Sequence, residues 1–299
     1  MIREAGVHSS NEEAGTMFPI RTILFPVDFS DPGTAWADQV CGVAQHFGAA
    51  VVVLHVLQIP PYNQPPVEPY APIVDLEALR WSTGEELKHF VKSQFVGVDV
   101  RCMLEEGDPA LRIVESARNE HVDVVMLPSH GRGWFRHLLL GSTTAKVLHD
   151  CDCPVWTGAH VPEYSGPRTF RSIICGVDLK SDMTNAIEWS AAMTASYEAK
   201  LTFVHAVPWY EDGAEHLVTH RSALERASRS VEGLMRNLEI KAPIAVQSGN
   251  IAQVMREAAL RQQADLMVIG QGCIRKFMGR LRTNAYGIIR ESPCPVIRV

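Results

Sequence analysis

The sequence predicts an α/β protein built from two tandem open parallel five-stranded sheets with helices on both faces. Short apolar runs alternate with amphipathic helical stretches, which is typical of a parallel sheet that is covered on both sides. Four segments also recur in the same order in the two halves of the chain. The length of 299 residues suits about two domains of ordinary size.

The repeat can be followed pair by pair. The matching segments are RTILFPVD (21–28) with RSIICGVD (171–178), VLHV (53–56) with FVHA (203–206), VDVVML (122–127) with ADLMVI (264–269), and CPV (153–155) with CPV (294–296). Duplication and fusion of one domain explains this order. We therefore predict domains at 20–158 and 170–299, joined by a linker at 159–169 and preceded by a flexible tail at 1–19.

Each half is predicted to contain the same elements in the same order. In the first half these are strands at 22–27, 50–57, about 98–105, 123–127 and 155–157, with helices at 33–47, about 75–95, from 109 to about 120, and before the last strand. In the second half they are strands at 172–177, 200–207, 240–247, 265–269 and 296–299, with helices at 184–197, 217–238, up to about 263, and before the last strand. Asp108 and Asn250 are good N-cap residues for the third helix of each half, and Pro109 suits a first helical turn.

Composition limits the classes of partner and compartment. The net charge of −6 gives no electrostatic basis for binding nucleic acid or an anionic membrane. The seven cysteines are an odd number, which argues against a disulfide framework and fits a reducing compartment. The start of the chain lacks the pattern of a secretory signal, and the most apolar run, 49–57, is too short to span a bilayer. A cytoplasmic location is the expectation.

A ligand is expected at the carboxyl ends of the strands, where the strand order of an open α/β sheet reverses. In the first half, Asp28, Val56 and the loop that begins at Pro128 follow strand ends. Within that loop, Gly141 would allow a ligand to approach the backbone closely, and Ser142 stands at a predicted helix start. A helix N-terminus attracts anions through its unpaired N–H groups and its dipole.

These residues resemble the nucleotide-binding branch of the universal stress protein family. Gly131, nine further residues, Gly141 and Ser142 fit the later part of its Gly-x2-Gly-x9-Gly-Ser/Thr motif, and the strands ILFPVDFS and LHV are similar to that branch. The resemblance implies an adenine-nucleotide α-hydrolase-like fold that binds ATP, with or without Mg²⁺, in the first domain only. It also implies a regulatory or sensor role in the stress response without fast catalysis. The site implied by position consists of Pro26, Val27, Asp28, Val56, Leu127, Pro128, His130, Gly131, Gly141, Ser142 and Thr143.

Both halves depart from the motif. Pro128 replaces its first glycine, so binding is weakened if that position needs an N–H group or a positive φ, and survives if it needs only a compact residue. The second half keeps Gly270 but has Cys273 in place of the second glycine, and Arg282 in place of the third. Its equivalent positions, predicted to have lost ATP binding, are Asp178, Ala206, Gly270, Cys273, Arg282 and Thr283.

Several residues that could suggest chemistry have simpler interpretations. His55 and His205 occupy equivalent strand positions, where a histidine is usually a core residue with one nitrogen hydrogen-bonded. The spacing of Cys151 and Cys153 is not a zinc pattern, and Cys153 and Cys294 are expected to be buried as small apolar side chains. Ser129 and His130 lack the surroundings of a nucleophile elbow, so no catalytic residue and no metal site is predicted.

Two other functions remain open. The chain could be an interaction module without nucleotide, since Pro128 and the altered second loop weaken the motif, or a very slow ATPase. An adenylyl-transferring ligase would need a glycine-rich loop after the first strand, which residues 28–33 do not supply. The resemblance implies that the halves pair about a pseudo-twofold axis near their final strands and that the chain forms a homodimer. Neither a nucleic acid nor a membrane is expected as a partner.

Overall fold

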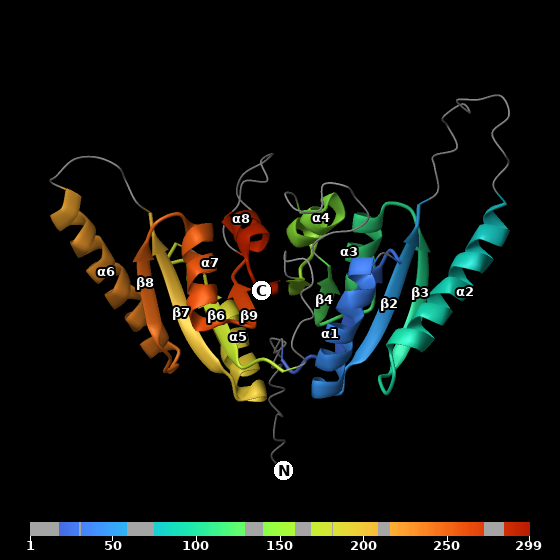
Figure 1. Cartoon of the computed structure of the whole chain (residues 1–299), viewed down its shortest axis with the longest axis horizontal. Helices are drawn as coiled ribbons and strands as arrows, with labels where there is room; N and C mark the ends of the chain where they lie inside the picture. The colour runs from blue at the N-terminus through green and yellow to red at the C-terminus, as the bar shows by residue number, and fades with distance from the viewer. Residues whose placement is uncertain are drawn as a thin grey trace, which may run out of the picture.

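The computed structural model describes residues 18–29, 31–58, 75–128, 140–158, 169–180, 182–208, 216–271 and 284–299. They form two similar halves that stand side by side, each with strands in the middle and helices around them (Figure 1). Most of the predicted tail, most of the linker and most of the 128–143 loop lie outside these residues, as do His130, Gly131, Cys273, Arg282 and Thr283.

The elements alternate between strand and helix, as the apolar pattern predicts. The strands are β1 (Thr22–Val27), β2 (Ala50–Leu57), β3 (Val100–Glu106), β4 (Val124–Leu127), β5 (Val155–Thr157), β6 (Ser172–Gly176), β7 (Lys200–Val207), β8 (Ile244–Ser248), β9 (Leu266–Ile269) and β10 (Val296–Arg298). The helices are α1 (Asp31–Phe47), α2 (Leu76–Gln94), α3 (Pro109–Asn119), α4 (Ser142–Asp150), α5 (Thr184–Tyr197), α6 (His216–Asn237), α7 (Ile251–Gln262) and α8 (Asn284–Glu291).

The two halves share one sheet. Its strand order is β3-β2-β1-β4-β5-β10-β9-β6-β7-β8. The first five and the last five strands are parallel within their own group, and β5 and β10 join the groups as an antiparallel pair in which Ile297 lies opposite Trp156. The predicted fold class is confirmed, with the added finding that two five-stranded parallel sheets meet edge to edge.

Helices cover both faces because neighbouring strand residues point to opposite sides. Phe25 is fully buried on the face that α1, α2, α5 and α6 cover, whereas Leu24 is fully buried against α3, α4, α7 and α8. Strands that are buried on both faces must be apolar throughout, which explains the continuous apolar runs of the sequence.

Element boundaries differ from the prediction mainly at β8, which begins at Ile244 rather than at residue 240. Pro243 precedes it and has no N–H group to donate to a neighbouring strand, so the pairing starts after it. The two predicted N-caps are confirmed: Asp108 accepts a hydrogen bond from the Leu111 N–H at 3.0 Å, and Asn250 accepts one from the Ala252 N–H at 2.9 Å.

Removal of the Asp108 cap is expected to destabilise the folded protein. Replacing Asp108 with alanine is expected to lower the free energy of unfolding by about 1 kcal/mol, whereas asparagine, which the second half uses at this place, should preserve most of it. The hydrogen bond from Leu111, and then Lys146, lower the pKa of Asp108. The contribution of its charge should therefore be present above the unfolded pKa and disappear as the pH falls through the lower folded pKa. Urea unfolding of both variants between neutral and acidic pH measures this, and equal losses for alanine and asparagine would contradict it.

Candidate functional site

The strand order reverses between β1 and β4 in the first half. These strands are parallel neighbours, with Ile23 opposite Val124, but the chain continues from β1 towards β2 and from β4 towards β5 on the other side. Asp28 and Pro128 follow the carboxyl ends of the two strands. This is the position at which open α/β sheets bind ligands.

Helix α4 starts beside this reversal point. Its N-cap is Gly141, which has no side chain that could cap the first turn, and the first helical hydrogen bond runs from the Ala145 N–H to the Gly141 carbonyl at 2.9 Å. The Thr144 hydroxyl donates to the Pro128 carbonyl at 3.3 Å and so ties the helix start to the end of β4. The N–H groups of Ser142 and Thr143 precede the helical ladder and carry the positive end of the helix dipole.

A cavity of about 430 Å³ lies at the start of α4. It gathers the end of β2, the start of α3 and the start of α4, and its described lining residues are Gln58, Gly107, Asp108, Pro109, Ala110, Ser142, Thr143 and Lys146. Two helix N-termini therefore converge on one space. Pro128 is not among these described lining residues, although it lies next to the helix start.

Among the described residues that line the cavity there is one cation and one carboxylate. The Lys146 ammonium lies 3.4 Å from a carboxylate oxygen of Asp108, and both side chains are exposed. Lys146 stands one helical turn after Ser142, so it projects along the same face of α4. The hydroxyls of Ser142 and Thr143, the Lys146 ammonium group and the N-terminus of α4, which has no side-chain cap, make this space suitable for an oxyanion.

The end of β1 is fixed by a stack of rings. Phe29 has a positive φ of 55°, which is costly for a bulky residue, and its ring stacks on His55 with centroids 4.5 Å apart. His55 in turn donates from Nδ1 to the Val27 carbonyl at 2.8 Å. The strained residue directly follows Asp28, so these contacts hold Asp28 at the strand end.

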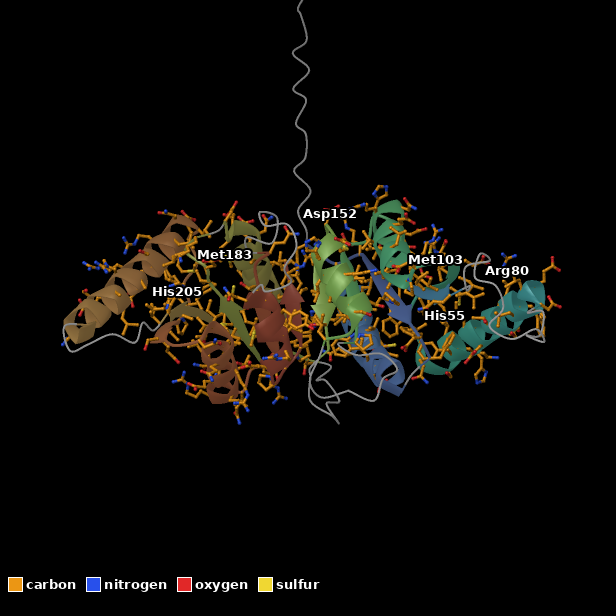
Figure 2. The ribbon with its side chains drawn as sticks, turned by 90° about the horizontal axis from the view of Figure 1, so that it is seen from above. His55, Arg80, Met103, Asp152, Met183 and His205 are labelled. Atoms are coloured by element: carbon orange, nitrogen blue, oxygen red, sulfur yellow. The ribbon has the colours of Figure 1, made fainter. Side chains whose placement is uncertain are left out.

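The histidine pair behaves as the sequence predicts. His205 donates from Nδ1 to the Val177 carbonyl at 2.7 Å, as His55 does to Val27, and both imidazoles are half-buried. They occupy corresponding places in the two halves (Figure 2). The interpretation of a core histidine with one nitrogen satisfied is confirmed for both.

In the second half a methionine packs over Gly270. A Cβ atom at Gly270 would lie 2.7 Å from the sulfur of Met183, a buried residue just before α5, so the Met183 side chain lies directly against this glycine. Gly33 is the residue that corresponds to Met183 in the sequence of the first half. The Asp178 carboxylate accepts a hydrogen bond from the Lys180 N–H at 2.9 Å and closes its own turn.

The structure brings only part of the predicted site together. Ser142 and Thr143 line the cavity, and Gly141 is the cap of α4. Pro26, Val27 and Leu127 lie in their strands, Val56 is half-buried in β2, and the second-half Ala206 is buried in β7.

Sequence reasoning missed Gln58, Gly107, Pro109, Ala110 and Lys146, and gave Asp108 only a capping role. A signal for them exists. Gly107 follows the carboxyl end of β3 just as Asp28 follows that of β1, and Lys146 lies four residues after Ser142.

The cysteines correct one expectation. Cys294 is buried as predicted, but Cys153 is half-buried, and its sulfur touches that of Cys151. Within the residues that the structure describes, no cluster of three or more His, Cys, Asp or Glu side chains could hold a metal ion. None of the described helices is both long and apolar enough to cross a membrane.

Both halves of the chain are similar to known proteins of one family. The model of the universal stress protein family matches residues 19–157 and again residues 169–299. A universal stress protein of Methanocaldococcus jannaschii is 29% identical over 136 residues, which are 45% of this chain and 79% of that protein. A universal stress protein of Thermus aquaticus is 30% identical over 137 residues, which are 45% of this chain and 96% of that protein.

Solved structures match over nearly the whole chain. The crystal structure of a universal stress protein from Archaeoglobus fulgidus aligns with a TM-score of 0.67 and 20% identity, covering 93% of this chain and 95% of that one. At this identity the likeness shows the fold, and the family matches carry the assignment. The chain belongs to the universal stress protein family and carries two domains of that family in tandem.

Proposed function

We propose that this protein binds ATP through its first half and acts as a regulator or sensor in the stress response without fast chemistry of its own. The observation that carries the proposal is the cavity at the start of α4, where the end of β2 and the start of α3 meet Ser142, Thr143 and Lys146. Its volume of about 430 Å³ lies in the range of small-ligand sites.

The groups around the cavity suit a phosphate chain. Ser142 and Thr143 offer hydroxyls and N–H groups. The Lys146 ammonium group, which pairs with Asp108, can turn to a phosphate instead. The Asp108 carboxylate would repel a bare triphosphate, which favours binding together with Mg²⁺. Pro109 and Ala110 give the cavity an apolar wall.

Packing supports the restriction to the first half, because the Met183 side chain lies against Gly270, the first glycine of the motif in the second half. The described lining residues support a regulatory role: they include no histidine, and their one carboxylate, Asp108, is held by Leu111 and Lys146. A general base needs a partner that orients it towards a substrate, and this set offers none.

A thermal-shift titration tests the proposal. Nucleotide-free full chain should gain stability with millimolar ATP and Mg²⁺, because a ligand that binds only the folded state raises the unfolding temperature. Lys146→Met should require about tenfold more ATP for the same shift, equivalent to ~1.4 kcal/mol. Lys88→Met, which removes an exposed lysine of α2, is the matched control and should behave as wild type. No shift at millimolar ATP would overturn the proposal.

A further inference from the structure

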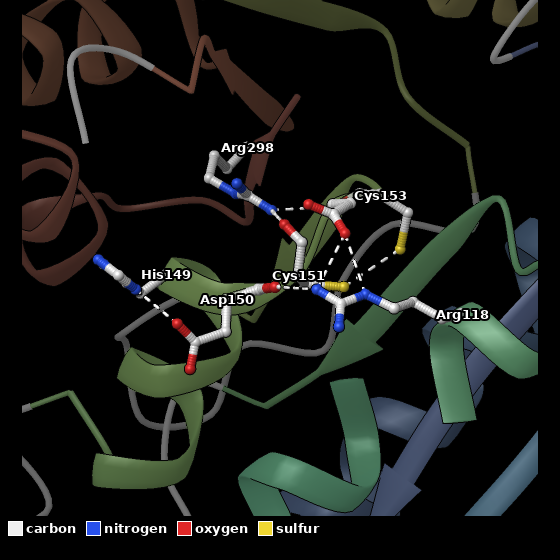
Figure 3. Close-up of polar contacts among 7 residues, drawn as sticks. Arg118, His149, Asp150, Cys151, Cys153 and Arg298 are labelled. Carbon is white, nitrogen blue, oxygen red and sulfur yellow. Dashed lines mark hydrogen bonds and ion pairs between the residues drawn. The ribbon is translucent and has the colours of Figure 1, made fainter. Parts of the chain in front are cut away.

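Two thiols lie in contact at the turn between α4 and β5. The sulfur atoms of Cys151 and Cys153 are 3.3 Å apart, and both cysteines are free (Figure 3). Cys151 is the C-cap of α4 and only 3% exposed, whereas Cys153 is half-buried. A disulfide requires a separation of about 2.05 Å, so the sulfurs must approach by only about 1.3 Å.

The second half lacks this pair. Ser292 and Cys294 stand at the equivalent positions, and the Ser292 hydroxyl donates to the Cys294 carbonyl at 2.6 Å. Cys294 is 2% exposed, and burial raises its pKa to about 12. The same turn is therefore built with a serine and one thiol in one half, and with two thiols in contact in the other.

An arginine from the second half holds the cysteine turn. Arg298 of β10 is 1% exposed, and its guanidinium donates to the Cys151 carbonyl at 2.8 Å and to the Cys153 carbonyl at 3.0 Å. Its counterpart in the first half is Thr157, which has no charge. On the outer side, Arg118 donates to the Asp152 carboxylate at 3.0 Å. The turn is thus fixed from both sides with its two sulfurs together.

The surroundings also activate one thiol. The hydrogen bond from the Cys153 thiol, the Cys153 N–H and the charge of Arg298 lower the pKa of Cys151, against burial and the charge of Asp152. The same hydrogen bond, with burial, raises the pKa of Cys153, which remains the proton donor. A thiolate is the nucleophilic form of cysteine, and it has a neighbouring thiol here that can resolve an oxidised sulfur.

We propose that Cys151 and Cys153 form a redox-active dithiol that closes to an intramolecular disulfide on reaction with hydrogen peroxide. The Cys151 thiolate attacks one peroxide oxygen, the O–O bond breaks, and the departing hydroxide takes up a proton to leave as water, so Cys151 becomes a sulfenic acid. The Cys153 sulfur then attacks the Cys151 sulfur, the S–O bond breaks, and a second water leaves with the Cys153 proton. Two thiols are oxidised by two electrons, and one peroxide is reduced to two waters.

The disulfide should be reversible. It would close a small ring across one intervening residue, and strained disulfides are reduced more readily than relaxed structural ones. The site is independent of the nucleotide cavity, because its chemistry rests on the opposite end of α4.

Peroxide oxidation of the reduced, folded full chain tests the proposal. Samples are quenched with N-ethylmaleimide and digested, and the mass of the peptide that contains Cys151 and Cys153 is measured by mass spectrometry. We expect that peptide to lose two hydrogen atoms and to resist alkylation until dithiothreitol is added. Cys102 is the internal reference. Its side chain is exposed, and the partial burial of its thiol raises its pKa. The pair should react at least about fivefold faster than Cys102.

Two variants distinguish reaction through the Cys151 thiolate from reaction of any accessible thiol. Cys151→Ser gives the first half the serine–cysteine arrangement of the second half, and its Cys153 should react no faster than Cys102. Cys153→Ser should stop at the sulfenic acid of Cys151, which dimedone traps. The proposal is overturned if Cys102 is oxidised before the pair in the folded wild type, or if Cys153 of Cys151→Ser reacts as fast as in wild type.

Discussion

Gly141→Asp is expected to weaken ATP binding by the full chain at least about 100-fold, or ~2.7 kcal/mol, while leaving the protein as stable as wild type or slightly more stable. Gly141 has φ −57° and ψ 143°, a conformation open to any residue, so the substitution needs no backbone change. An aspartate N-cap would hydrogen-bond the first N–H groups of α4 and place its own charge where the phosphate is proposed to bind.

The two effects are measured on the same samples, by titration calorimetry with ATP and Mg²⁺ and by urea unfolding. Ser82→Asp, which adds the same charge to an exposed position of α2, is the matched control and should bind ATP as wild type does. Retention of ATP affinity within twofold by a folded Gly141→Asp protein would show that the first turn of α4 is not the phosphate site.

Trp156→Ala is expected to lower the free energy of unfolding by about 3–5 kcal/mol. Trp156 is fully buried in β5, and its ring lies 5.4 Å from that of Phe170 and 6.1 Å from that of Trp189, with Ile297 of β10 opposite it in the sheet. Truncation would leave a cavity at the joint between the halves. Urea unfolding at neutral pH measures the loss.

Trp156→Phe is the control for this joint. The buried indole N–H of Trp156 has no hydrogen-bond partner among the described residues, so its removal sacrifices no hydrogen bond. Phenylalanine should therefore cost much less than alanine, about 1–2 kcal/mol for the lost ring volume. A loss below about 1 kcal/mol for Trp156→Ala would contradict the view that this residue holds the two halves together.

The fold was predictable because buried strands appear in the sequence as continuous apolar runs. The predicted limits of β1, β2 and β5 agree with the structure, since strands buried on both faces are apolar from end to end. The pairing of β5 with β10 was harder to predict, because it depends on the shape of the two sheet edges. Only the resemblance placed the last strands near one another. The start of β8 follows from Pro243, which has no N–H group for the strand pairing.

The site was predictable only where it is continuous in sequence. Ser142 and Thr143 could be found from the helix-start pattern, whereas Gln58 and Lys146 belong to different elements that meet only in the folded sheet. The Gly270–Met183 contact also needs three dimensions, because a glycine in a motif looks the same whether it faces a ligand or a side chain. The Cys151–Cys153 contact arises in a turn, where the alternation of a strand does not apply.

The binding stoichiometry of ATP tests the central claim most directly. Full-length protein, shown by mass spectrometry of its released ligands to be free of nucleotide, is titrated with ATP and Mg²⁺ in a calorimeter. We expect one ATP per chain. Two per chain would contradict a site confined to the first half, and no heat at millimolar ATP would contradict the nucleotide site itself.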